Sequence, residues 1–189
     1  KAFLTLERLP EHPRILDVGC GTGSQTLVLA GLTPGDITAV DNHAPFIRIL
    51  EREIERAGLT GRVKCVVADM ASMDFNKDSF DLVWSEGAAN IMGFGNALEA
   101  WRPLLRPNGY MAVSELVWFK EQAPQEIREF FTEAYPDMKH YKAIYPVVES
   151  AGYELIDYFP IPDESWWTDY YTPARKTIAE LREKYPDED

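Results

Sequence analysis

Three glycines in one short segment, with an acid on each side, are the residues whose spacing most clearly predicts chemistry. Gly19, Gly21 and Gly23 follow a short apolar run, Asp17 lies inside the end of that run, and Asp41 follows a second apolar run. Glycine has no Cβ and accepts a positive φ, so such a turn brings bare backbone close to a ligand. The helix expected directly after the turn adds unpaired N–H groups and the positive end of its dipole. The segment therefore predicts a nucleotide-type binding site.

The residue types around the glycines distinguish between two kinds of ligand. A dinucleotide site expects Gly-x-Gly-x-x-Gly, in which the third glycine lets helix and strand pack closely around a pyrophosphate. Ser24 stands where that third glycine would be. The Asp17 carboxylate would repel a pyrophosphate, whereas it suits a ligand with an ammonium or sulfonium charge. Both features argue against a nicotinamide dinucleotide.

Polar side chains also follow later apolar runs. Asp41 can accept hydrogen bonds from both hydroxyls of a ribose, and Asn42 is placed along the adenine or the ribose. Asp69 ends the third run, and Ser85 and Glu86 end the fourth. Ligands of open α/β sheets bind outside the carboxyl ends of the strands, so we expect these side chains to share one edge. Glu86 is the first candidate for an acid or base that faces a substrate; a carboxylate that caps a nearby helix is the alternative.

The second half of the chain adds one acid and several aromatic side chains. Glu115 lies in an expected strand over 110–118, where a buried carboxylate needs a partner or a raised pKa. Catalytic and structural roles for Glu115 stay open. Trp118, Trp166 and Tyr170 could form the wall of an apolar substrate pocket, with ordinary core packing as the alternative.

Apolar runs alternate with helical patterns along the chain, which predicts an α/β fold, a three-layer αβα sandwich with a mostly parallel sheet. The expected strands cover 14–18, 37–40, 63–68, 80–85, 110–118 and 153–159, and the expected helices cover 24–32, 45–57, 94–105, 124–134, 139–151 and 173–185. Asp81, at the start of the fourth strand, is expected to be structural.

Composition narrows the choice of ligand. The 189 residues carry 19 Lys and Arg against 31 Asp and Glu, a net charge of −12, and no basic run appears. A nucleic acid would need clustered basic side chains, and a membrane span would need about 18 apolar residues in sequence, so we expect a small-molecule substrate. Cys20 and Cys65 fit reduced core thiols, and we expect no metal. The chain begins with Lys1 and has no secretory signal, so we expect a piece of a cytoplasmic protein with a solvated acidic tail at 187–189.

Several of these segments resemble motifs of the class I S-adenosylmethionine-dependent methyltransferases. The segment Ile15–Gly23 is similar to motif I, and Phe80–Ala88 is similar to motif IV. The segment Leu104–Tyr110 is similar to the Leu-Leu-Lys/Arg-Pro-Gly-Gly turn, with Asn108, which tolerates left-handed geometry, replacing the first glycine. The resemblance covers about 13–118. It points to the group of ubiquinone/menaquinone-biosynthesis-type enzymes, also described as type 11 or type 25 methyltransferase domains.

The resemblance implies a Rossmann-like fold, S-adenosylmethionine as cofactor, and SN2 transfer of its methyl to an N, O, S or C nucleophile. Asp17 would lie near the methionine ammonium, and Asp69 would accept from the adenine amine while the Met70 backbone meets a ring nitrogen. A helix N-cap is the competing role for Asp69. The full set of implied cofactor residues is Asp17, Gly19, Cys20, Gly21, Thr22, Gly23, Asp41, Asn42, Asp69, Met70 and Ser85.

The organisation implied is a single domain over 1–189, with a cofactor-binding core at about 13–118 and substrate-side helices and an aromatic segment at about 119–189. The antiparallel seventh strand usual in this family is expected to be absent. Glu86 and Glu115 are the candidate catalytic residues. Two alternatives stay open: a methyltransferase-like module that binds cofactor without catalysis, and a nicotinamide-dependent oxidoreductase. A homodimer is also left open.

Overall fold

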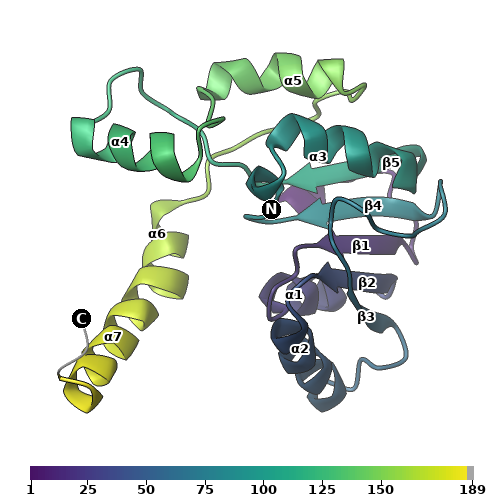
Figure 1. Cartoon of the computed structure of the whole chain (residues 1–189). Helices are drawn as coiled ribbons and strands as arrows, with labels where there is room; N and C mark the ends of the chain where they lie inside the picture. Colours follow the sequence, from purple (N-terminus) through teal and green to yellow (C-terminus); the bar gives the residue numbers. More distant parts are fainter. Residues whose placement is uncertain (187–189) are drawn as a thin grey trace. The chain divides into compact units, whose positions relative to one another are not determined.

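Five parallel strands form the sheet of this computed structural model, which describes residues 1–186; the expected acidic tail at 187–189 lies outside the described residues (Figure 1). The strands are β1 (Arg14–Val18), β2 (Asp36–Asp41), β3 (Val63–Val67), β4 (Phe80–Ser85) and β5 (Leu105–Val113). Their order is β3-β2-β1-β4-β5. The chain therefore adds β2 and β3 on one side of β1 and then returns to add β4 and β5 on the other side, which puts a topological switch point between β1 and β4. Ligands of open α/β sheets bind at such a switch point, outside the carboxyl ends of the strands.

Helices cover both faces of the sheet, as expected from the sequence (Figure 1). On one face, α1 (Ser24–Leu32) and α2 (Ala44–Arg56) bury Leu29 and Leu50 in a core that also contains Ile15. On the other face, α3 (Phe94–Trp101) and α5 (Ile144–Ser150) bury Trp101 and Val148 in a second core that contains Leu16. Successive strand residues point to opposite faces, which is why neighbours in β1 belong to different cores. The predicted Rossmann-like αβα sandwich is confirmed.

The boundaries of some elements differ from the prediction. The helix expected over 94–105 ends at Trp101 and continues as a 3-10 turn, Arg102–Leu104, because Pro103 cannot donate a backbone hydrogen bond. Strand β5 begins directly after this turn and ends at Val113, so it starts and stops five residues earlier than expected. Asn108 has a φ of 62° inside the strand, close to a register irregularity between β4 and β5. Residues 107–109, which were expected to form a turn, therefore belong to the irregular strand β5.

The strand expected over 153–159 is wrong. Those residues form no strand and pair with none of the five strands, and an apolar run without a partner strand gives no hydrogen-bonded ladder. The helices before them are α4 (Gln125–Ala134), a 3-10 turn (Tyr141–Ala143) and α5. The expected helix over 139–151 is thus realised in two shorter parts.

The chain divides into two compact units, Lys1–Leu155 and the residues from Ile156 onward. The second unit contains α6 (Asp163–Trp166), a π-helical segment (Trp167–Tyr171) and α7 (Thr172–Lys184). Each unit is described by itself. The expectation of one domain over 1–189 stays a prediction.

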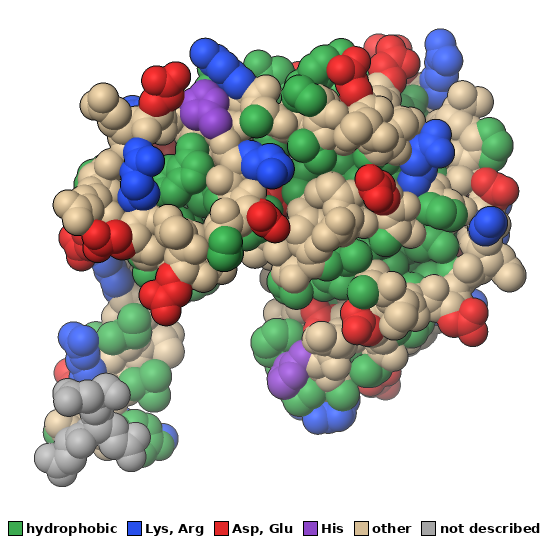
Figure 2. All heavy atoms as spheres, turned by 45° about the horizontal axis from the view of Figure 1, so that its top comes forward, with side chains coloured by type: hydrophobic (Ala, Val, Ile, Leu, Met, Phe, Trp, Pro, Cys, Tyr) green, Lys and Arg blue, Asp and Glu red, His purple; other side chains and the backbone are tan. Residues whose placement is uncertain are grey.

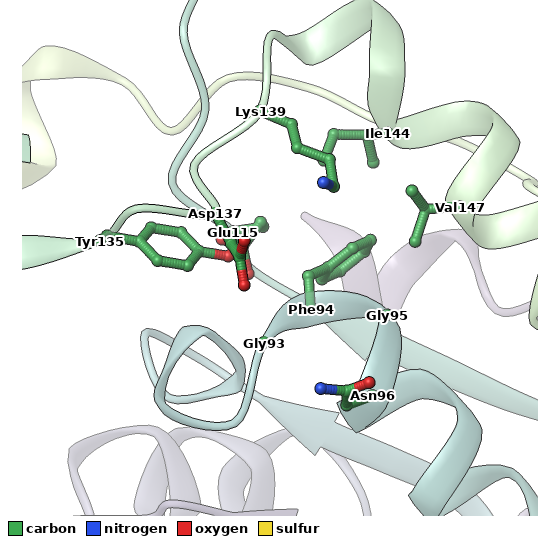
Figure 3. Close-up of a pocket in the computed structure, with 10 residues that line it drawn as sticks. All are labelled: Gly93, Phe94, Gly95, Asn96, Glu115, Tyr135, Asp137, Lys139, Ile144 and Val147. Carbon is green, nitrogen blue, oxygen red and sulfur yellow. The ribbon is translucent and has the colours of Figure 1, made fainter. Parts of the chain in front are cut away.

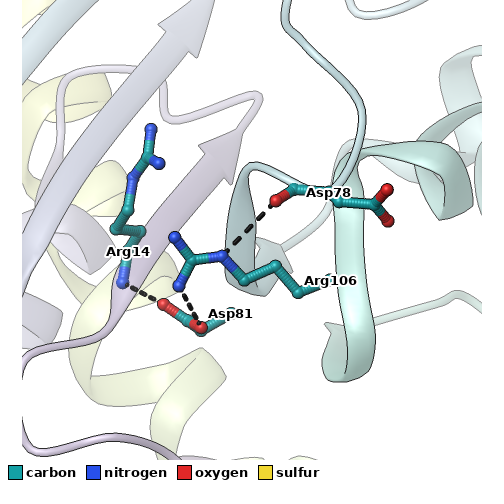
Figure 4. A network of polar contacts seen from close by, with 4 residues as sticks. All are labelled: Arg14, Asp78, Asp81 and Arg106. Carbon is teal, nitrogen blue, oxygen red and sulfur yellow. Dashed lines mark hydrogen bonds and ion pairs between the residues drawn. The ribbon is translucent and has the colours of Figure 1, made fainter.

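A polar network fixes the amino-terminal edge of the sheet (Figure 4). The buried Asp81 carboxylate accepts hydrogen bonds from the Arg14 backbone N–H and from Arg106 Nη1, both at 2.7 Å. Arg106 Nε also donates to the Asp78 carbonyl at 3.4 Å. These contacts tie the starts of β1, β4 and β5 together, so Asp81 is structural, as predicted. The opposite edge of the sheet is left for ligands.

Candidate functional site

The glycine loop after β1 is shaped by both packing and backbone geometry. Gly19, Gly21 and Gly23 have φ values of 72°, 55° and 92°, a region that L side chains rarely adopt. A Cβ on Gly19 would lie 2.3 Å from the Cβ of Ala88, and one on Gly23 would lie 2.1 Å from Leu50. A Cβ on Gly21 would meet nothing within 4 Å. Two glycines therefore let the loop pack, whereas Gly21 keeps open space beside the backbone.

Asp41 connects the end of β2 to this loop. Its Oδ2 accepts from the Gly21 N–H at 2.9 Å, and its Oδ1 accepts from the His43 N–H at 2.8 Å. Each carboxylate oxygen has a second lone pair, so the half-buried group can still accept two hydrogen bonds from a ligand. Asn42 follows directly and is exposed. The expected ribose acceptor is thus held rigidly beside the open face of the loop.

Asp17 is buried beneath the loop, on the same face as α1. Its Oδ2 accepts from the hydroxyl of Thr26, a fully buried residue of α1, at 2.6 Å. Burial raises the pKa of Asp17 from its ordinary 3.8 to about 6; the Thr26 hydrogen bond lowers the pKa, and the charges of Glu86 and Asp41 raise it. No sequence signal marks Thr26 for this contact, because a strand residue and a helix residue nine positions apart form no local pattern.

The end of β3 lies next to the same loop. The Ala68 N–H donates to the Asp41 carbonyl at 3.1 Å, and the Trp101 indole donates to the Met70 carbonyl at 3.0 Å. The Met70 side chain is 3.7 Å from the position of a Cβ on Gly19. Asp69 is exposed, and its Oδ1 accepts from the Ala71 N–H at 2.9 Å. Asp69 therefore uses one carboxylate oxygen to close a turn, and this turn lies at the edge of the sheet where the adenine is expected.

The end of β4 carries Ser85 and Glu86 to the same edge. Glu86 is exposed and its Oε1 accepts from the Trp84 indole at 2.9 Å, which holds Glu86 on the face of the sheet that contains Trp84 and α1. Its charge acts on Asp17. Ser85 is fully buried, and its Oγ has no hydrogen-bond partner within residues 1–186. Glu86, Asp17 and Asp41 thus form a group of acids around the glycine loop.

Glu115 lies two residues beyond β5 and on the other face of the sheet. Met111 and Val113 pack against the core that contains α3, and strand alternation carries Glu115 to the same side. Glu115 lines a cavity of about 190 Å³ together with Tyr135 and Lys139 (Figure 3). The structure therefore does not bring the two candidate catalytic acids, Glu86 and Glu115, together. The sequence offered no pattern for the contribution of Tyr135 and Lys139, since they reach the cavity from a loop between α4 and α5.

The predicted aromatic wall is divided between the two units. Trp118 is half-buried and packs edge-to-face on Phe131 at a ring-centroid distance of 5.7 Å. Trp166 and Tyr170 belong to the second unit, where both are exposed and their rings lie 6.3 Å apart, edge to face. A substrate-contacting role for these three residues stays a prediction.

Residues 1–186 contain no cluster of three His, Cys, Asp or Glu side chains arranged to hold a metal ion. Over the same residues, no helix has the length and apolar character that crossing a membrane requires. Cys20 and Cys65 are both free, and burial raises the pKa of the Cys20 thiol.

Comparison with known proteins places this geometry in a family. A family model described as a methyltransferase domain matches residues 15–109, about half of the chain. Demethylmenaquinone methyltransferase from Thermus thermophilus is 33% identical over 114 residues, covering 59% of this chain and 50% of that protein. The chain spans about half the length of the first curated relatives that it matches.

Two solved structures show the same fold. A methyltransferase from Thiobacillus denitrificans, in complex with S-adenosyl-L-homocysteine, is 22% identical with a TM-score of 0.82, covering all of this chain and 76% of that one. The [4+2]-cyclase SpnF is 24% identical with a TM-score of 0.75, covering 98% of this chain and 67% of that one. The glycine loop, the β2 and β3 acids and the motif IV segment all lie at the edge that this fold uses for ligands. The chain belongs to the class I S-adenosylmethionine-dependent methyltransferase family.

Proposed function

We propose that this chain binds S-adenosylmethionine at the carboxyl edge of β1, β2 and β3 and transfers its methyl group to a small molecule. The observation that carries the proposal is the Asp41 carboxylate, clamped by the Gly21 and His43 N–H groups beside the open face of the glycine loop. The clamp fixes two oxygens in one orientation while leaving a lone pair on each. A ribose with two neighbouring hydroxyls matches that pattern of acceptors.

The remaining residues of the edge fit the other parts of the cofactor. Asp17, Glu86 and Asp41 place negative charge around the loop, which favours a ligand with ammonium and sulfonium groups. Gly21 leaves room for the methionine chain, and Cys20 and Thr22 lie beside it in the loop. Asn42, Asp69 and Met70 follow β2 and β3, where the adenine would lie, and Ser85 ends β4.

The proposed reaction needs little covalent chemistry from the protein. S-adenosylmethionine supplies a methyl already activated on a sulfonium, which a nucleophile displaces in one SN2 step. The chain's residues hold the ribose, orient the reacting groups and exclude water. Glu86 would face the acceptor from the end of β4 and take its proton where the nucleophile carries one.

A small molecule is the acceptor that the surface favours. On the face shown in Figure 2, Lys and Arg side chains are interspersed with Asp and Glu and do not gather into one patch. A nucleic acid would need such a patch to neutralise its phosphates. The absence of nucleic-acid partners, a homodimer and a cytoplasmic location remain predictions of the sequence.

Binding of the cofactor alone would not establish methyl transfer. The likeness to the [4+2]-cyclase SpnF shows that proteins of this fold include one named for another reaction. A silent cofactor-binding module is therefore the second candidate. A nicotinamide-dependent oxidoreductase is weaker, because Ser24 begins α1 where a dinucleotide site expects glycine.

Two experiments separate these functions. Thermal shifts with S-adenosylhomocysteine and with NADH, run in parallel, test the ligand: stabilisation by NADH alone would refute the proposal. Single-turnover reactions with S-[methyl-¹⁴C]adenosylmethionine and a metabolite extract test transfer. We expect label in a small-molecule product; cofactor binding without any labelled product would favour the silent module.

A further inference from the structure

The cavity beside β5 combines apolar walls with several ionisable groups. It lies between the amino end of α3, the segment after β5 and the amino end of α5, and has a volume of about 190 Å³. Phe94 supplies an aromatic wall, and Glu115, Tyr135, Asp137 and Lys139 supply the ionisable groups (Figure 3). All of these residues belong to the first unit, so the cavity does not depend on the placement of the second.

Glu115 lacks the partners that a buried carboxyl group normally has. Both of its oxygens are shielded from solvent, and neither has a partner within hydrogen-bond geometry among the residues that the structure describes. Burial raises its pKa, while the Tyr135 hydroxyl and the Leu116 N–H, which lie near the carboxyl but outside hydrogen-bond geometry, lower it. A buried acceptor without a donor costs about 1–3 kcal/mol, and more when charged. Because buried polar groups in proteins are satisfied with few exceptions, the orphaned carboxyl indicates a missing donor.

A second orphaned group lies on the same face of the sheet. The Ser85 Oγ is buried without a partner, and Ser85 pairs in register with Val113, two residues before Glu115. The two unsatisfied groups thus lie at the ends of adjacent strands, and of the two only Glu115 lines the cavity.

We propose that this cavity recognises a hydrogen-bond-donating group of the methyl acceptor, an amine or a hydroxyl, through Glu115. The inference rests on the proposed function, since it identifies the ligand as the acceptor. Glu115 and Asp137 outnumber Lys139 when both acids are ionised, so an anionic group is disfavoured. The donor reaches the shielded oxygens after rotation of the Glu115 or Tyr135 side chain, a fast motion for side chains that border a cavity.

The test follows the Glu115 carboxyl carbon by ¹³C NMR in the whole chain, in the presence of saturating S-adenosylhomocysteine. The probes are propylammonium, propan-1-ol and propionate, used up to about 100 mM because ligands of about four heavy atoms gain only a few kcal/mol. A donor that binds the ionised carboxylate lowers the pKa of Glu115. We expect a downward shift with propylammonium or propan-1-ol and none with propionate. The first two probes distinguish an amine from a hydroxyl.

Two matched variants test whether the probe binds at Glu115. Glu115→Gln should weaken binding of the effective probe at least tenfold, whereas Glu99→Gln, an exposed position on α3, should leave it unchanged. A pKa shift caused only by propionate, no shift with any probe, or full probe affinity in Glu115→Gln would overturn the inference. The wild-type titration decides alone if Glu115→Gln does not fold. Loss of S-adenosylhomocysteine binding by the wild-type chain would refute the proposed function instead, and the titration without that ligand would still test the cavity.

Discussion

Replacing Asp41 with alanine removes the two acceptors that the structure presents beside the glycine loop. Hydrogen bonds to a charged group contribute about 1.5–3 kcal/mol each, and about 1.4 kcal/mol corresponds to a tenfold change in affinity. Loss of one ribose hydrogen bond therefore weakens cofactor binding about tenfold or more, and loss of both weakens it about 100-fold or more. The Gly21 and His43 N–H groups also lose their acceptor, which loosens the loop and acts in the same direction.

Isothermal titration calorimetry with S-adenosylhomocysteine measures this effect directly. Asp36→Ala is the matched control, because Asp36 is an exposed acid at the opposite end of the same strand. We expect wild-type affinity for Asp36→Ala and a loss of at least tenfold for Asp41→Ala, with both variants folded by circular dichroism. Unchanged affinity in a folded Asp41→Ala variant would refute the assignment of Asp41 to the ribose.

Three further predictions concern the same edge. Gly19→Ala should lower the free energy of unfolding, measured with denaturant, by more than Gly21→Ala, because only the Gly19 methyl meets backbone-anchored Ala88; similar losses would contradict this. Gly21→Ala should instead weaken S-adenosylhomocysteine binding, since its methyl projects into the open space beside the loop. Asp17→Asn should raise the free energy of unfolding at pH 7 by up to about 3 kcal/mol, because a pKa raised from 3.8 to about 6 disfavours the folded carboxylate. Thr26→Val should lower stability at pH 7 by about 1–3 kcal/mol through loss of the hydroxyl that donates to Asp17, and Thr26→Ser, which keeps it, should lose less.

The elements nearest the cofactor edge were the most predictable. Strand β1 and helix α1 match their expected bounds, because the apolar run, the glycines and Ser24 all favour the same local structure, a strand followed by a turn and a helix. The segment 153–159 failed for the opposite reason. Its residues are mostly apolar or aromatic, but a strand also needs a partner, and pairing is a property of the whole sheet.

Prediction of the site from the sequence was limited in the same way. The sequence placed Glu86 at the end of the fourth expected strand and Glu115 within the fifth, 110–118; β4 and β5 are adjacent in the sheet, but Glu115 lies two residues beyond β5. The sequence could not assign the two acids to faces, because the end of β5 lies five residues before the expected position and each residue of register reverses the side. Thr26 and Tyr135 each contact a residue of another segment, and these segments come together only when the chain folds. No local pattern predicts them.

The raised pKa of Asp17 makes stability and cofactor binding respond to pH in opposite directions. An acid whose folded pKa lies above its unfolded value binds its proton more tightly in the folded state, so its contribution to stability falls as pH rises from about 4 to about 6. Under the proposed function, the ionised form, which destabilises the fold, is the form that would attract the ammonium of the cofactor. Between pH 7.5 and pH 5, we therefore expect the unfolding free energy attributable to Asp17 to rise and S-adenosylhomocysteine affinity to fall. Calorimetry and denaturant titrations on wild type and Asp17→Asn measure both, and an affinity change of equal size in Asp17→Asn would assign the effect to another group.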